Sequence, residues 1–301
     1  MRYSILSRSV VAFGLFVFVG SLSLSAASPV RASGSDPQLL SEEFKFTEGP
    51  IADRQGHVYF TDQPNDRIMV WTVEGKLETF LQPSGRANGL YFDLQGNILA
   101  CADEKNQLWQ ITPDKDVTVL IENIDGKLLN GPNDLWVDPN GGVFFTDPFY
   151  KRDYWNRSEK EIAKENVYYM PPNRSGVRIA AGDFVRPNGI VGTPDGKKIY
   201  VADINARKTY VFEIGANGEL KNRQLFVEMG SDGMTMDGKG NLYLSGRGVT
   251  VFNPDGEKID EIPIDEGWTA NVCFGGRDRN ILFVTAMDSL YAVRMKVSGT
   301  E

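Results

Sequence analysis

The chain has 301 residues, of which 41% are hydrophobic and 24% are charged, as in an ordinary globular protein. Its formal net charge is −8 and its basic residues do not cluster, which argues against a nucleic-acid partner. The chain has one histidine, His57, so a zinc site built on several histidines is impossible. A Ser-His-Asp triad would have to use that residue, but we expect His57 to be a strand residue with a structural role.

The first 32 residues are typical of a targeting signal. Arg2 and Arg8 supply positive charge, residues 10–20 form a short apolar core, and the candidate cleavage points follow Ala27 and Ala32. An uncleaved anchor is the alternative, although the apolar run is shorter than the roughly 20 residues that cross a bilayer. We therefore expect an exported protein, periplasmic or secreted, with one domain over residues 33–301. After cleavage we expect no membrane contact, and a monomer.

Six copies of one pattern follow, beginning 39 to 55 residues apart. Each copy has a short apolar run, a polar turn, an apolar-aromatic run, a third run and a weaker edge run. In the first five copies a glycine falls eight residues after the first residue, at Gly56, Gly96, Gly141, Gly196 and Gly240. Short runs rich in Val, Tyr, Phe and Trp favour strands. The pattern predicts an all-β fold, a six-bladed β-propeller with four-stranded antiparallel blades.

The stretch SDGMTMDGKGNLYLS, residues 231–245, looks like a calcium loop, but residues 237–240 occupy the place of a hairpin turn. They also lack the order of ligands found in an EF-hand. Residues 36–46 can supply a strand that closes the ring. The third copy carries an insertion, residues 148–166, which is either a solvated loop or a partial lid. Within it, residues 159–164 are the one helix candidate. Whether Cys101 and Cys273 pair stays open.

The first residue of every copy carries a side-chain oxygen. These residues are Glu48, Asn88, Asn133, Asn188, Asp232 and Asn271. Equivalent positions of a propeller repeat lie on a ring, and the first strand of each blade lines the central channel. Capping of turns is the structural alternative. Two carboxylates in a narrow channel repel unless a cation lies between them. Such an oxygen cage suits Ca²⁺, with Mg²⁺, Mn²⁺ or Zn²⁺ as alternatives.

The segments FTEGP, LNGPNDLWVDPNGGVFFTDP, RPNGI and SDGM resemble the SMP-30/gluconolactonase/LRE family over nearly the whole chain after residue 45. The resemblance implies a six-bladed propeller with one divalent metal on its axis. The implied metal ligands are Glu48, Asn133, Asn188 and Asp232. Asn133 could instead hold a metal-bound water and the substrate. Asn88 and Asn271 would line the channel without coordinating the metal.

The resemblance also implies hydrolysis of a small-molecule lactone, typically that of a sugar acid such as gluconolactone, with the metal polarising the carbonyl. Asp232 is then the predicted general base. The predicted substrate-binding residues are Asn88, Asn133, Asp134 and Asp147, although the two aspartates could equally be turn caps. Animal members carry an Arg two residues before the PND-type Asn, where this chain has Gly131, so recognition of the sugar must differ.

Two alternatives stay open. The first is a lactonase or phosphotriesterase that acts on a non-sugar substrate, because the same metal cage polarises a P=O group equally well. The second is a non-catalytic propeller that binds a protein or glycan. A binding propeller has no need of two axial carboxylates, which favours the enzyme.

Overall fold

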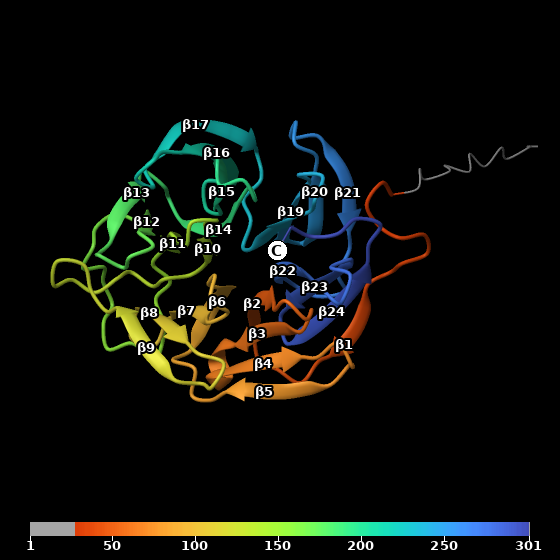
Figure 1. Ribbon diagram of the computed structural model, residues 1–301, viewed down its shortest axis with the longest axis horizontal. Coiled ribbons are helices and arrows are strands. Elements are labelled where there is room, and N and C mark those ends of the chain that lie inside the picture. Colours follow the sequence, from red (N-terminus) through yellow and green to blue (C-terminus); the bar gives the residue numbers. More distant parts are fainter. Residues whose placement is uncertain (1–27, 301) are drawn as a thin grey trace, which may run out of the picture.

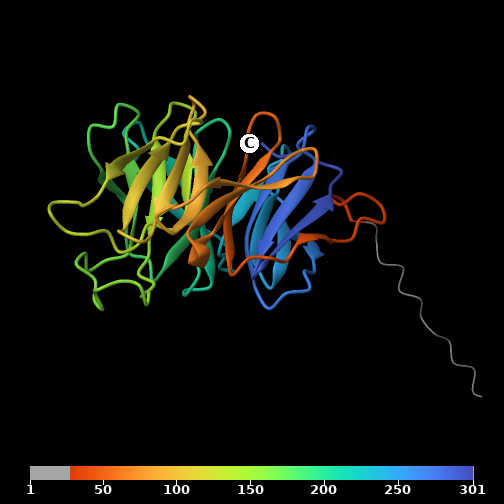
Figure 2. The same cartoon turned by 90° about the horizontal axis from the view of Figure 1, so that it is seen from below.

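The structure is a computed structural model, and it describes residues 28–300. Six four-stranded antiparallel sheets surround a central axis, which confirms the predicted six-bladed propeller (Figure 1). Seen from the side, the blades form one layer, with connecting loops on both faces (Figure 2). The innermost strand of each blade contacts the innermost strand of the next blade all the way round the ring.

Blades 1 to 5 each use four consecutive strands. Blade 1 contains β2 (Thr47–Ala52), β3 (Val58–Asp62), β4 (Arg67–Trp71) and β5 (Leu77–Leu81). Blade 2 contains β6 (Ala87–Phe92), β7 (Ile98–Ala102), β8 (Gln107–Ile111) and β9 (Val117–Ile121). Blade 3 contains β10 (Leu135–Val137), β11 (Val143–Asp147), β12 (Asn166–Met170) and β13 (Arg178–Ala181). Blade 4 contains β14 (Pro187–Gly192), β15 (Lys198–Asp203), β16 (Lys208–Ile214) and β17 (Leu220–Val227). Blade 5 contains β18 (Met234–Met236), β19 (Leu242–Gly246), β20 (Gly248–Phe252) and β21 (Lys258–Ile262).

Blade 6 joins the two ends of the chain. It contains β22 (Thr269–Gly275), β23 (Ile281–Ala286), β24 (Ser289–Arg294) and the N-terminal β1 (Gln38–Ser41), which pairs with β24. The expectation that residues 36–46 close the ring is therefore confirmed. The pairing of the N-terminal strand with the C-terminal blade joins the two ends of the chain and closes the ring.

Residues before β1 also pack onto the ring. Val30 is 1% exposed and its carbonyl accepts the backbone N–H of Lys296 at 2.7 Å. The Arg31 guanidinium makes two hydrogen bonds to Asp260, at 2.9 and 3.1 Å. This segment lies between the two predicted cleavage points, which follow Ala27 and Ala32. Most of the predicted signal, residues 1–27, lies outside the described residues.

The repeated Asp and Gly build the first turn of each blade. In the fifth copy, Asp237 Oδ1 accepts the backbone N–H groups of Lys239 and Asn241, and Gly240 has φ of +80°. The aspartates of the first three copies accept two backbone N–H groups in the same way. Glycine adopts a left-handed backbone conformation without a steric penalty, which explains why the repeat has a glycine at this turn position. The predicted hairpin turn is confirmed.

Burial falls from the axis outward. Every residue of β2 and β14 is buried, whereas most of the outer strands β9 and β17 is exposed. The apolar clusters lie between neighbouring blades, and each combines strands of adjacent sheets. This layering explains why the first and second runs of each copy are rich in apolar residues while the last run is more polar. Over residues 28–300 no helix is long and apolar enough to cross a bilayer.

The structure also bears on the predicted helix, the two cysteines and His57. The helix candidate at residues 159–164 is wrong, because this segment is irregular, and the described part of the chain holds one short helix, the 3₁₀ turn η1 (Gln63–Asn65). Cys101 and Cys273 are buried in different apolar clusters, and no disulfide joins them. His57 Nδ1 accepts the backbone N–H of Val73, which confirms its structural role.

Candidate functional site

The ring of copy-starting residues lies where the innermost strands begin. The six positions are Glu48 in β2, Asn88 in β6, Asn133 before β10, Asn188 in β14, Asp232 before β18 and Asn271 in β22. Five of them are buried, and Asp232 is partly exposed. At the other end of β18 the C-terminal residues 298–300 bond to residues 236 and 238, so this segment crosses the opposite side of the channel.

The glycine that follows the first residue in four copies allows the inner strands to approach closely. An added Cβ would collide with the next copy: Gly49 with Asn88 O at 2.2 Å, Gly89 with Asn133 O at 2.6 Å, Gly189 with Asp232 O at 2.8 Å, and Gly233 with Asn271 Cγ at 1.9 Å. Backbone bonding accounts for part of the polar pattern, since Glu48 Oε2 accepts the N–H of Gly49 and Asn271 Oδ1 accepts that of Val272. The glycines have a separate role, which is to let the inner strands lie close enough for the polar side chains to form one ring.

A pocket of about 280 Å³ opens over this ring. Among the predicted site residues it gathers Glu48, Asn88, Asn133 and Asp232. Its wall also contains Tyr150, Arg152 and Trp268, which repeat reasoning did not predict as site residues. Tyr150 and Arg152 belong to the insertion, and Trp268 lies three positions before the sixth copy starts.

Asp232 is the best-anchored carboxylate of the pocket. Its Oδ1 accepts a hydrogen bond from Asn188 Nδ2 at 2.7 Å, and its Oδ2 accepts one from Trp268 Nε1 at 2.6 Å. Asn188 Nδ2 also donates to the Tyr150 hydroxyl at 2.9 Å. These bonds hold the carboxylate in one orientation, which a catalytic or metal-binding group needs.

Burial and like charge oppose ionisation of the carboxyl groups on the axis. Burial raises the pKa of Glu48 well above its usual range, and the charge of Asp232 adds to this effect. Burial likewise raises the pKa of Asp232 to about 6, although hydrogen bonds from Trp268 and Asn188 and the positive charge of Arg152 act in the opposite direction. A divalent cation between the two carboxylates would remove this conflict.

The donor set fits a hard cation. The Oδ1 atoms of Asn88 and Asn188 are buried and have no hydrogen-bond partner among residues 28–300. Buried acceptors normally find a partner, and an oxygen-seeking ion would supply one. Within the same residues no three His, Cys, Asp or Glu side chains form a metal-binding group, so amide oxygens must complete any site around Glu48 and Asp232. Carboxylate and amide oxygens are ligands that Ca²⁺ prefers.

Neither of the two aspartates predicted to bind substrate lines this pocket. Asp134 is 7% exposed beside the axial ring, and its Oδ1 accepts the backbone N–H of Leu135. Asp147 does not line the pocket, because its two oxygens accept the backbone N–H groups of Asn130 and Gly131 at 2.9 and 2.8 Å. Burial raises the pKa of each carboxyl to about 7. The geometry of Asp147 is that of a group that positions the loop leading to Asn133.

The insertion after β11 is a lid rather than a free loop. Tyr150 and Arg152 reach the pocket, while Tyr154 and Trp155 anchor the segment to Asp103 at the end of β7. The lid interpretation of residues 148–166 is therefore the one that the structure supports. It encloses the pocket from one side and adds a positive charge near the axial carboxylates.

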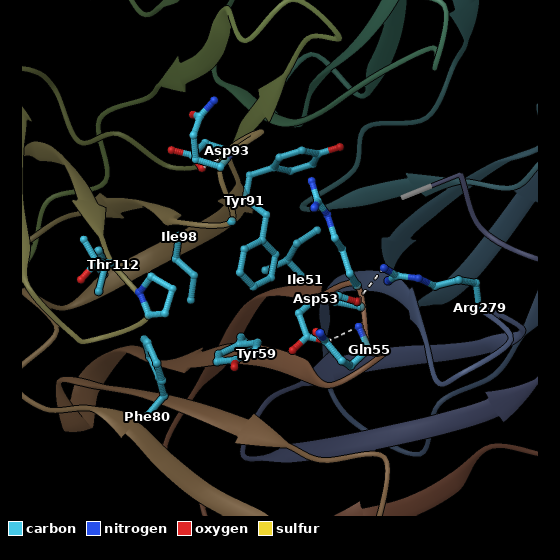
Figure 3. Close-up of a pocket in the computed structure, with 17 residues that line it drawn as sticks. Ile51, Asp53, Gln55, Tyr59, Phe80, Tyr91, Asp93, Ile98, Thr112 and Arg279 are labelled. Atoms are coloured by element: carbon cyan, nitrogen blue, oxygen red, sulfur yellow. Dashed lines mark hydrogen bonds between the residues drawn. The ribbon is translucent and has the colours of Figure 1, made fainter.

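A larger cavity, of about 530 Å³, lies at the other end of β2 (Figure 3). Ile51, Tyr59, Phe80 and Ile98 line it, and Arg279 reaches across its rim to the Asp53 backbone. Apolar and polar side chains both line this cavity, and the six residues that begin the copies do not contribute to it. Its size alone does not identify it as the site of chemistry.

The fold and the pocket define a class: a six-bladed propeller with a converging set of carboxylate and amide oxygens on its axis. A family model for the SMP-30/Gluconolactonase/LRE-like region matches residues 46–288, and the chain belongs to this family. A gluconolactonase from Zymomonas mobilis is 30% identical over 293 residues, which cover 87% of this chain and 82% of that protein.

Two solved structures show the same architecture. A gluconolactonase from Xanthomonas campestris superimposes with a TM-score of 0.81 and 27% identity, covering 88% of this chain and 91% of the other. Regucalcin from Agrobacterium tumefaciens, a calcium-binding protein, has a TM-score of 0.72 and 18% identity, covering 88% and 95%. At that lower identity the likeness shows the fold alone.

Proposed function

We propose that the chain is a divalent-metal-dependent hydrolase of a sugar-acid lactone, with Ca²⁺ as the preferred ion. The lactone-hydrolase class rests on the family match and on the identity to gluconolactonases over most of the chain. The metal is supported by one observation in particular: Glu48 and Asp232 line one pocket, and the buried Oδ1 atoms of Asn88 and Asn188 have no hydrogen-bond partner among residues 28–300. A binding propeller gains nothing from burying Glu48 against Asp232.

Glu48, Asn133, Asn188 and Asp232 would hold the ion, which supplies Lewis-acid polarisation of the lactone carbonyl. Hydrolysis adds water across the ring ester bond: the hydroxyl joins the carbonyl carbon and a proton passes to the ring oxygen. Asp232 would move that proton, and the hydrogen bonds from Trp268 and Asn188 that orient its two oxygens support this role. Tyr150 and the rest of the lid limit the access of bulk water to the pocket.

The test is acid release from D-glucono-1,5-lactone by the full chain, with Ca²⁺ and after EDTA treatment. We expect chelation to abolish the enzymatic rate and added Ca²⁺ to restore it. Glu48→Gln and Asp232→Asn, which keep the side-chain shape, should each lower kcat/KM by about 100-fold or more. Glu266→Gln is the matched control, since its carboxylate bonds to Ser289 and does not line the pocket. A rate that survives both EDTA and the two substitutions would refute the proposal.

Export to the periplasm or the exterior remains part of the proposal. Signal-peptide cleavage after Ala27 would leave Val30 and Arg31 in place against blades 5 and 6. N-terminal sequencing of protein recovered from an exporting host would test this. A mature chain that begins at residue 33 would contradict cleavage after Ala27, and an uncleaved chain retained inside the cell would contradict export.

A further inference from the structure

The insertion supplies the one cation among the residues that line the axial pocket. Arg152 is held by Asp103, whose Oδ2 accepts the Arg152 Nε–H at 2.7 Å. Asp103 is 2% exposed and belongs to blade 2, whereas the insertion leaves blade 3. The ion pair therefore fixes the guanidinium across two blades and orients it as a rigid fork.

Most of the donors of this guanidinium remain unused. An arginine carries five N–H donors, and Arg152 uses only Nε in hydrogen bonds to the described residues. No ion pair within residues 28–300 joins it to Glu48 or Asp232, although it shares the pocket with both. The side chain is 25% exposed and lines the pocket, and its guanidinium carbon lies 5.6 Å from the centroid of the Tyr150 ring, another residue of the pocket wall.

Three further contacts keep the lid in this position. The Tyr154 hydroxyl donates to Asp103 Oδ2 at 2.6 Å, and Trp155 Nε1 donates to the Asp103 carbonyl at 2.8 Å. The Trp155 ring also fills the space beside Gly131, where an added Cβ would lie 3.0 Å from both Trp155 Cη2 and Asp103 Oδ1. The insertion thus occupies the space beside Gly131, and Arg152 is the cation that it brings to the pocket.

We propose that Arg152 is the specificity-determining residue of the pocket and that its terminal amino groups bind hydroxyl oxygens of a polyhydroxylated lactone. This inference rests on the proposed lactone hydrolysis and names the substrate class of the same site. A pocket of about 280 Å³ accommodates a ligand the size of a single sugar ring. Asp103 is a positioning residue, because it touches the guanidinium and not the ligand.

The first arm of the test compares two six-membered lactones on the Ca²⁺-loaded full chain. D-glucono-1,5-lactone carries hydroxyl groups and δ-valerolactone carries none. Arg152→Gln should raise KM for the hydroxylated lactone so that kcat/KM falls by about 10- to 100-fold, as expected for a lost hydrogen bond to a charged group. For δ-valerolactone, Arg152→Gln should change kcat/KM by less than about 3-fold. Equal losses on both substrates, or no loss on either, would overturn the inference.

Lys151→Gln is the matched control, because Lys151 is the exposed neighbour of Arg152. This substitution removes one positive charge from the same loop, as Arg152→Gln does. It should behave like wild type on both lactones. Asp103→Asn should shift the ratio of the two kcat/KM values in the same direction as Arg152→Gln but less far. If Asp103 were merely structural, the rates on both lactones would fall together.

The second arm separates this inference from the proposed function. Calorimetric titration of D-glucitol, an unreactive polyol, into Ca²⁺-loaded wild type and Arg152→Gln measures the subsite without catalysis. We expect the variant to bind the polyol at least about 10-fold more weakly. If wild type hydrolyses no lactone but shows this difference, the subsite stands and the function fails. If wild type hydrolyses gluconolactone and Arg152→Gln matches it in both arms, the function stands and the subsite is refuted. Absence of polyol binding to wild type, together with absence of activity, refutes both.

Discussion

Gly189→Ala tests whether the glycines of the repeat hold the polar ring together. An alanine Cβ at this position would lie 2.8 Å from the carbonyl oxygen of Asp232 and 3.0 Å from Gly233 Cα. Comfortable contacts to carbon begin near about 3.5 Å, so the strands β14 and β18 must move apart by about half an ångström. Both obstructing atoms are backbone atoms, which cannot rotate away as a side chain would.

Overpacking of this kind costs about 1–3 kcal/mol. In a domain of this size each kcal/mol lowers Tm by about 2–4 °C, so we expect a fall of about 2–12 °C. The displaced backbone carries Asp232, so the affinity for Ca²⁺ should fall as well. Urea unfolding gives the free energy of unfolding, and the Ca²⁺-induced rise in Tm reports on the site.

Gly267→Ala is the control, because an added Cβ there meets no atom within 4 Å. It should be neutral or slightly stabilising, by up to about 1 kcal/mol, through reduced freedom of the unfolded chain. If Gly189→Ala unfolds at the same temperature as Gly267→Ala and responds equally to Ca²⁺, the close-approach argument is wrong.

The remaining predictions concern the termini, pH and metal. Arg31→Ala should lower the free energy of unfolding in urea by about 1–2 kcal/mol, because it removes two hydrogen bonds to Asp260. Arg277→Ala, which removes an exposed ion pair with Glu74, should change that free energy by less than about 0.5 kcal/mol. Equal effects of the two substitutions would contradict the packed N-terminus. Burial raises the pKa of Asp134 and Asp147 to about 7, so the metal-free folded chain keeps protons that the unfolded chain releases above about pH 4. Its Tm in EDTA should therefore fall as pH rises from 5 to 8, and a Tm that rises over this range would exclude these shifts. Saturating Ca²⁺ should raise the Tm at pH 8, and an unchanged Tm would argue against an axial ion.

Local patterns predicted the blades because each copy carries its own turn and strand signals. The Asp237 turn and the six axial positions could be identified from spacing alone, since equivalent repeat positions must lie on one ring. The same logic placed Glu48 beside Asp232 although they are far apart in the sequence.

The lid contacts could not be predicted in this way. Arg152 and Asp103 lie in an insertion and in a different blade, so no spacing within a repeat connects them. The insertion itself was visible as surplus length rich in aromatic and charged residues, and this was the one available signal. Asp147 was predicted to bind substrate, but its two oxygens bond to a loop. The sequence alone does not distinguish a strand-end aspartate that faces a pocket from one that caps a loop.

The most direct test of the metal-dependent site is an activity titration. Metal-stripped protein, at a concentration above the Kd for Ca²⁺, receives from zero to three equivalents of Ca²⁺ while acid release from D-glucono-1,5-lactone is followed. The account predicts no enzymatic rate at the start, a linear rise, and a sharp break at one equivalent per chain. Full activity in the stripped protein, or a rate that Ca²⁺ does not change, would contradict a catalytic ion on the axis.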